Sequence, residues 1–215
     1  GINMTRVEER WQAYLSLEPE IIERRVRQVT RAPDTVTLTI EEGVLLASGA
    51  AEPSWLARAA APIAGVDAVD LSGVELVPSP ALEQSLAMVE EHRVLFAIGS
   101  AALDVASAQE TLQAIADAYA RVSALADIEG WQVELTMTGR TDATGPTERN
   151  ALLSTRRSEV VRDALQTRGV AINRVRIMGL GVTEPLRAND AEQESTLNRS
   201  VSFALTLTPL PLPPR

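Results

Sequence analysis

The chain has 215 residues, an apolar content of 45%, a formal net charge of −9 and no cysteine. The apolar fraction is enough for one or two folded domains, whereas the negative charge argues against non-specific nucleic-acid binding, which needs a basic surface. The lack of cysteine excludes disulfides and thiolate metal sites. The single histidine, His92, argues against zinc sites and histidine-based catalytic triads.

Residues 1–31 are predicted to form two N-terminal helices. Apolar residues at helical spacing indicate the first helix over residues 4–17. The second helix places Ile22, Val26 and Val29 on one face. Its arginines are interpreted as a solvated face rather than as a contact with anionic lipid.

Residues 32–77 are predicted to form a small β–β–α–β domain. A hairpin is expected over residues 35–49 with its turn at Glu42–Gly43, followed by a helix over residues 53–65 and a strand over residues 66–76. This order, with a strand pair around a Gly-Val turn and a helix of small residues, resembles the BON domain. The resemblance implies contact with phospholipid or an envelope surface, and a packing or spacer role is the alternative.

Pro78-Ser79-Pro80 is the expected domain boundary, and residues 78–92 are predicted to be a linker helix. A second domain is expected over residues 93–208, with a proline-rich tail over residues 209–215 that is disordered or extended. The expected elements of this domain are a strand within residues 93–103, a helix with an apolar stripe from Val105 to Val122, a strand over residues 131–138, a helix that ends at Gly169, and strands over residues 174–181 and 199–207.

The helix that ends at Gly169 carries polar residues on its apolar face. Asn150, Ser154 and Arg157 follow each other at spacings of four and three, among apolar residues that include Leu153, Val161 and Leu165. An inward guanidinium is costly unless it is paired and hydrogen-bonded. The nearest acidic residue in the sequence without an assigned partner is Asp142. We therefore predict a polar pocket built on Asp142 and Arg157.

The second half of the chain resembles the OmpA-like C-terminal domain, a peptidoglycan-binding module. The matching pieces are VLFAIGSAAL, GRTDATG, the N and LSTRR of the following helix, RVRIMGLG, the P and ND of the next loop, and NRSV. The resemblance covers residues 93–207. It implies a βαβαβ-β fold with a mixed sheet covered by helices, and hence an α+β protein of two small domains.

The resemblance also implies a ligand. In the family, a loop aspartate and a helix arginine hold the diaminopimelate of the peptidoglycan peptide stem, and these residues are Asp142 and Arg157 here. A carboxylate suits the ligand's ammonium group, a guanidinium suits its carboxylate, and the amides at the helix start add affinity for anions. The expected supporting residues are Thr141, Asn150 and Arg199.

Several positions depart from the family pattern. Arg140 stands where the family has histidine, Glu194 and Ser195 replace Gly-Arg, and Ser200 replaces the second arginine of NRRV. Two readings therefore stay open. The chain is either a peptidoglycan-binding anchor or spacer of a larger envelope assembly, or a degenerate module that serves protein interaction or oligomerisation with weak or no wall binding.

No catalytic set is apparent, because Ser154 has no histidine partner and His92 lies in a charged segment. Asp104, Asp127 and Asp190 lack metal-ligand spacing. We therefore expect that the protein is not an enzyme and that it holds no cofactor and no metal ion. The expected partners are peptidoglycan and, through the N-terminal domain, membrane lipid or envelope proteins, but no nucleic acid. The compartment implied is the periplasm, with a membrane anchor in a region outside this sequence.

Overall fold

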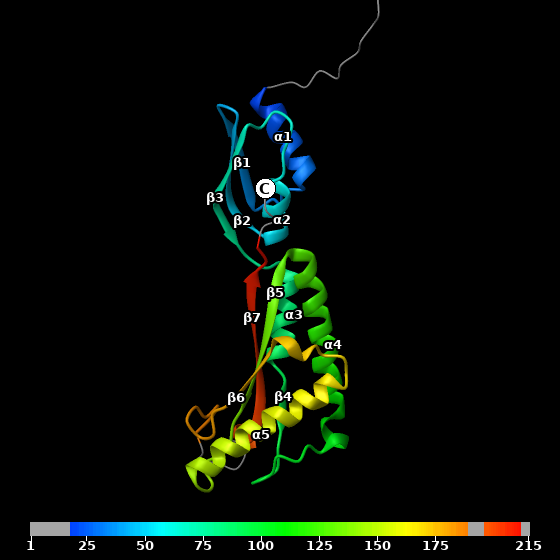
Figure 1. Cartoon of the computed structure of the whole chain (residues 1–215), viewed down its shortest axis with the longest axis vertical. Helices are drawn as coiled ribbons and strands as arrows, with labels where there is room; N and C mark the ends of the chain where they lie inside the picture. Colours follow the sequence, from blue (N-terminus) through cyan, green and yellow to red (C-terminus); the bar gives the residue numbers. More distant parts are fainter. Residues whose placement is uncertain (1–17, 189–195, 212–215) are drawn as a thin grey trace, which may run out of the picture. The chain divides into compact units, whose positions relative to one another are not determined.

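The computed structural model describes residues 18–188 and 196–211 (Figure 1). The described chain forms two compact units. The N-terminal unit consists of residues 18–51 and 55–77, and the C-terminal unit of residues 52–54, 78–188 and 196–211. The helix expected over residues 4–17 lies outside the described residues.

The N-terminal unit packs helices on a three-stranded sheet. Its elements are α1 (Pro19–Thr30), β1 (Val36–Glu41), β2 (Val44–Ala51), α2 (Pro53–Ala59) and β3 (Ala68–Leu76). The sheet order is β1-β2-β3, with β1 and β2 antiparallel and β2 and β3 parallel. A parallel pair cannot be joined by a tight turn, and α2 lies in the required crossover connection. Trp55 is the largest fully buried side chain of this unit.

Two helices of this unit differ from the sequence-based prediction. In α1, Val29 is 63% exposed and Thr30 is buried instead, so the buried stripe follows every fourth residue from Ile22. The helix predicted over residues 53–65 ends at Ala59. Pro62 explains the early end, because a proline disfavours helical backbone in the residue before it and cannot donate a backbone hydrogen bond.

The C-terminal unit packs helices on a four-stranded mixed sheet. Its elements are α3 (Pro80–Glu90), β4 (Arg93–Leu95), α4 (Val105–Glu129), β5 (Trp131–Gly139), α5 (Thr147–Gln166), the 3-10 helix η2 (Ile172–Arg174), β6 (Val175–Gly179) and β7 (Ser200–Pro209). The strand order is β4-β7-β5-β6, with only β5 and β6 parallel. The predicted α+β class and mixed sheet are confirmed.

The helix expected to be a linker, α3, is a core element of the C-terminal unit. It packs beside α4 and against β7 (Figure 1). Leu82 and Val89 are fully buried in this packing. Ser79 caps α3 by accepting a hydrogen bond from the Leu82 amide at 3.2 Å. The helix predicted to be a linker therefore has an apolar face that packs within the C-terminal unit.

The carboxyl ends of β5 and β6 come very close to α5. A Cβ atom added at Gly139 would lie 2.0 Å from the Ser154 carbonyl oxygen, and one added at Gly179 would lie 2.1 Å from Thr155 Oγ1. Only glycine permits this approach. As a result, the first half of α5 lies directly against the ends of these two strands.

Candidate ligand-binding site

A pocket of about 220 Å³ lies where the loop after β5 meets the start of α5. Four of the five predicted site residues line it, namely Asp142, Arg157, Thr141 and Asn150. The fifth, Arg199, contacts Asp142 from the chain just before β7. The other lining residues, which the sequence-based prediction missed, are Ile98, Gly99, Thr144, Gly145, Arg149 and Leu153.

Arg157 is buried, as its place on the inward face of α5 predicts, and its side chain is only 1% exposed. Its Nε donates to the Ser100 carbonyl at 2.9 Å, Nη1 to the Arg140 carbonyl at 2.8 Å and Nη2 to the Ala97 carbonyl at 3.0 Å. The guanidinium also lies 5.2 Å from the centre of the Phe96 ring, which is a cation–π contact. Arg157 thus holds the loop between β4 and α4 against α5.

These contacts explain why β4 is only three residues long. The strand was predicted within residues 93–103, but the carbonyls of Ala97 and Ser100 face Arg157 instead of a neighbouring strand. Burial lowers the pKa of Arg157 to about 10, while Asp142 opposes this effect and Arg199 adds to it. The side chain still carries its charge at neutral pH.

Asp142 forms its ion pair with Arg199 and not with Arg157, which corrects the predicted pairing. Asp142 Oδ2 lies 3.0 Å from Arg199 Nη1, and both side chains are largely buried. Asp142 Oδ1 accepts a hydrogen bond from the Thr144 amide at 3.2 Å, which closes the loop as an Asx turn. Arg157 does not need a carboxylate partner, because three backbone carbonyls accept its hydrogen bonds.

Asn150 and Thr141 complete the wall of the pocket. Asn150 Nδ2 donates to the Thr144 carbonyl at 3.2 Å, so it fixes the loop that precedes α5. The Thr141 amide donates to the Gly181 carbonyl at 2.9 Å. The Thr141 hydroxyl is buried, and no hydrogen-bond partner for it occurs among the described residues. A buried hydroxyl without a partner calls for an explanation, and a bound ligand or water supplies one.

Positive charge exceeds negative charge among the described residues that line or border this pocket. Among the described residues, the pocket and its border contain three arginines, Arg149, Arg157 and Arg199, and one carboxylate, Asp142. Arg149 is exposed in the first turn of α5, and no side chain caps this helix at Pro146. The start of a helix favours anions. In a protein with a net charge of −9, the pocket is therefore a local site for a negatively charged group.

Arg140 and Ser200, which depart from the family pattern, do not line the pocket. Arg140 donates from Nε to the Glu184 carbonyl and from Nη1 to Ser202 Oγ, both at 2.7 Å. Burial lowers the pKa of Arg140, partly opposed by Glu184. Ser200 is buried and donates to the Leu197 carbonyl at 2.7 Å. Glu194 and Ser195 lie outside the described residues.

Other kinds of site were sought in the part of the chain that the structure describes. There, no three His, Asp or Glu side chains come together in a way that could hold a metal ion. The described helices also include none with the length and apolar character needed to cross a membrane.

Comparison with known proteins identifies the second half of the chain. Residues 95–199 match the OmpA family. The chain is 40% identical to the probable lipoprotein YiaD of Escherichia coli (strain K12) over 72 residues, which is 34% of this chain and 32% of that protein. It is 28% identical to the peptidoglycan-associated lipoprotein of Brucella melitensis over 176 residues, which is 82% of this chain and 93% of that protein.

Among solved structures, the peptidoglycan-associated lipoprotein from Burkholderia pseudomallei is 26% identical, with 54% of this chain and 91% of that chain covered and a TM-score of 0.46. The OmpA family match does not include residues 32–77, so the BON-like character of the N-terminal unit stays a prediction. The expectation of a protein that is not an enzyme agrees with the family match. The chain therefore contains an OmpA family domain, and this domain spans residues 95–199.

Proposed function

We propose that the C-terminal unit binds the diaminopimelate of the peptidoglycan peptide stem in the pocket of Asp142 and Arg157. One observation carries this proposal: the pocket combines a buried arginine, a buried carboxylate and the buried hydroxyl of Thr141, which has no hydrogen-bond partner in the part of the chain that is described. The names of the relatives support it, since they include peptidoglycan-associated lipoproteins and a peptidoglycan-binding protein.

The free end of diaminopimelate carries an ammonium and a carboxylate on the same carbon atom, and the pocket has groups for both. A guanidinium has five N–H donors, of which Arg157 uses three for carbonyls, so two remain for a carboxylate. The amides at the start of α5 and the exposed Arg149 add to this anion site. Asp142 receives the ammonium, because a carboxylate has about four acceptor positions and Arg199 and the Thr144 amide occupy two.

In this proposal the protein is non-catalytic, lies in the periplasm, and anchors or spaces a larger envelope assembly. The OmpA-like domain, over residues 93–208, holds the cell wall, and the BON-like domain, over residues 32–77, faces membrane lipid or envelope proteins. The name "lipoprotein" of several relatives supports an envelope location.

One observation favours the second reading, in which the domain serves protein interaction with weak wall binding. Asp142 is already neutralised by Arg199 at 3.0 Å, so an incoming ammonium meets less negative charge than an unpaired carboxylate would offer. The two readings differ in affinity for the wall, and a binding measurement separates them.

Sedimentation of the full chain with purified diaminopimelate-type peptidoglycan tests the proposal. Asp142→Asn keeps the shape of the side chain but removes its charge, and we expect binding to fall by about tenfold or more. Arg149→Gln removes an exposed charge at the pocket and should reduce binding about two- to fivefold. Arg156→Gln is the matched control, because Arg156 lies on the same helix and pairs with Glu159 away from the pocket.

Lysine-type peptidoglycan supplies the ligand control, because lysine has the ammonium but lacks the neighbouring carboxylate. The proposal predicts clear preference for the diaminopimelate type, and free diaminopimelate should compete. A wild-type chain that stays in the supernatant would refute wall binding and favour the interaction-module reading. Asp142→Asn binding as well as wild type would refute the role of Asp142 in holding the ammonium.

A further inference from the structure

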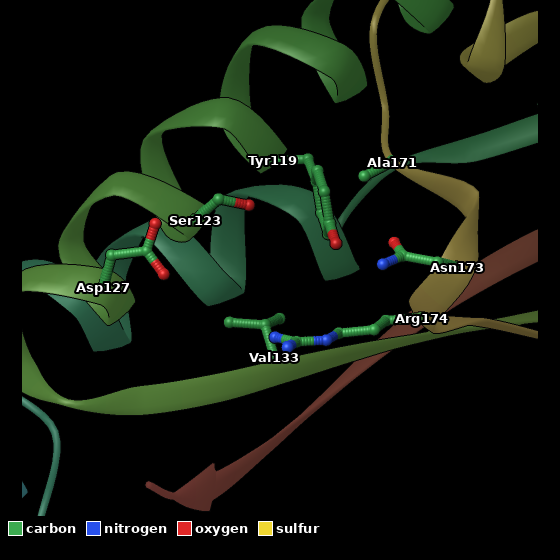
Figure 2. Close-up of a pocket in the computed structure, with 7 residues that line it drawn as sticks. All are labelled: Tyr119, Ser123, Asp127, Val133, Ala171, Asn173 and Arg174. Carbon is green, nitrogen blue, oxygen red and sulfur yellow. The ribbon is translucent and has the colours of Figure 1, made fainter.

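A second pocket, of about 200 Å³, lies in the C-terminal unit between α4, β5 and the segment of η2. It shares no lining residue with the pocket of Asp142 and Arg157. Figure 2 shows its side chains, whose polar ends point into a common space. The residues that matter here are Tyr119, Ser123, Asp127, Val133, Asn173 and Arg174.

The helix α4 supplies one wall of this pocket through regular spacing. Tyr119, Ser123 and Asp127 are four residues apart, so they lie on one face of the helix. Val133 of β5 forms an apolar floor, over which the Arg174 side chain extends toward Ser123 and Asp127 (Figure 2). Arg174 is the last residue of η2, so the turn before β6 sets its position.

The charges at the two sides of the pocket do not neutralise each other. No ion pair within 4.0 Å joins Arg174 or Asp127 to an opposite charge among residues 18–188 and 196–211. Arg174 and Asp127 are both exposed, whereas Tyr119 is only 6% exposed. Burial raises the pKa of the Tyr119 phenol, opposed by its hydrogen bond with Ser123 and by the charge of Arg174. Tyr119 is therefore protonated at neutral pH and can donate a hydrogen bond.

We propose that this pocket binds a short zwitterionic peptide. Its terminal carboxylate contacts Arg174 and the hydroxyl of Tyr119, and its terminal ammonium contacts Asp127. An anionic ligand would be repelled by the carboxylate of Asp127, and a cationic ligand would be repelled by the guanidinium of Arg174. A ligand with one charge of each sign satisfies both.

The dimensions set the length of this peptide. Tyr119 and Asp127 are eight positions apart, which is about 12 Å along the helix, and an extended chain of about three residues covers a similar distance. The volume of about 200 Å³ is below the range of roughly 300–1,000 Å³ that is typical for drug-sized ligands. The pocket therefore suits a dipeptide or tripeptide. This inference does not depend on the function proposed for the other pocket.

Nuclear magnetic resonance titration of the ¹⁵N-labelled full chain tests this proposal, with alanyl-alanine as the probe. Saturable shifts are expected in the backbone amides of residues 119–127 and 171–175. Arg174→Gln should weaken binding about tenfold or more, because the guanidinium holds the carboxylate together with Tyr119, and Asp127→Asn about two- to fivefold, because Asp127 is exposed. Tyr119→Phe keeps the ring and should weaken binding through loss of the hydroxyl alone.

Two controls make the result specific. Arg176→Gln removes a nearby exposed arginine that pairs with Glu134, and it should leave the affinity unchanged. N-acetyl-alanyl-alanine and alanyl-alanine amide each lack one terminal charge, and both should bind more weakly than the free dipeptide. Absence of saturable shifts, shifts confined to the pocket of Asp142, equal binding of the blocked dipeptides, or full binding by Arg174→Gln would each overturn the proposal.

Discussion

The substitution Arg157→Lys tests whether this arginine holds the loop between β4 and α4. Arg157 makes three hydrogen bonds to carbonyls of Ser100, Arg140 and Ala97, at 2.8–3.0 Å. These carbonyls surround a planar fork with donors at three nitrogen atoms. A lysine ammonium is a single compact donor group, so we expect it to keep one of the three hydrogen bonds and lose two.

The expected loss of stability follows from this count. A hydrogen bond from a charged donor contributes about 1.5 kcal/mol or more, so two of them amount to about 3 kcal/mol. The positive charge remains buried in the variant, so the cost of its desolvation is not recovered. A typical domain is stable by about 5–15 kcal/mol, and the variant should therefore fold with a much reduced margin.

Hydrogen exchange of the full chain, followed by mass spectrometry, measures this loss for the C-terminal unit alone. The free energy of opening in β5 should fall by about 3 kcal/mol, and residues 97–100 should exchange faster still. Arg156→Lys is the control, because Arg156 is exposed and should change stability by at most about 0.5 kcal/mol. A loss below about 1 kcal/mol in Arg157→Lys would refute the assigned role.

The pH dependence of the wild type provides a check on the same residue. The folded-state pKa of Arg157 is lowered to about 10, so the folded state loses this proton at lower pH than the unfolded state does. The contribution of Arg157 to stability therefore rises with pH above about 10 and is constant below it. The loss caused by Arg157→Lys should accordingly be compared at pH 7, where the wild-type arginine is fully charged.

Three other substitutions probe contacts elsewhere in the C-terminal unit. Gly139→Ala brings a Cβ atom within 2.0 Å of the Ser154 carbonyl oxygen and should cost about 3 kcal/mol in urea unfolding; unchanged stability would contradict the close packing. Burial raises the pKa of Tyr119, so the unfolded state ionises first and stability should fall as pH rises above about 10. Tyr119→Phe should remove that decrease in urea unfolding between pH 8 and pH 11, and an identical decrease would exclude Tyr119 as its source. Asn198 accepts from the Arg187 amide at 3.1 Å and donates to its carbonyl at 2.8 Å, so Asn198→Ala should speed amide exchange at Arg187 by about tenfold, and equal exchange would show that the loop has other support.

The sequence predicted the elements whose signal is local. The alternation over residues 131–138 predicted β5, which extends one residue further to Gly139, and its buried and half-buried residues follow that alternation. The polar residues Asn150, Ser154 and Arg157 were predicted to face inward, and all three are buried. These predictions succeed because side-chain direction along a strand or helix depends only on position within that element.

Prediction of element lengths was less successful, because neighbours in space decide where an element ends. The strand expected within residues 93–103 is limited to Arg93–Leu95. From the sequence, α3 was predicted to be a connecting helix, but its apolar side chains pack on α4 and β7. An apolar stripe shows that a helix has a buried face but not which element covers it.

The sequence by itself determined which polar residues come together, since it placed Asp142 in the loop before α5 and Arg157 on its inward face. Only the tertiary structure decided their partners. Asp142 pairs with Arg199, 57 residues away, and Arg157 binds the carbonyls of Ala97, Ser100 and Arg140. Every residue type has the same carbonyl, so no pattern in the sequence could have marked these acceptors. Arg157 does not need Asp142 as a direct ion-pair partner, because three backbone carbonyls accept its hydrogen bonds.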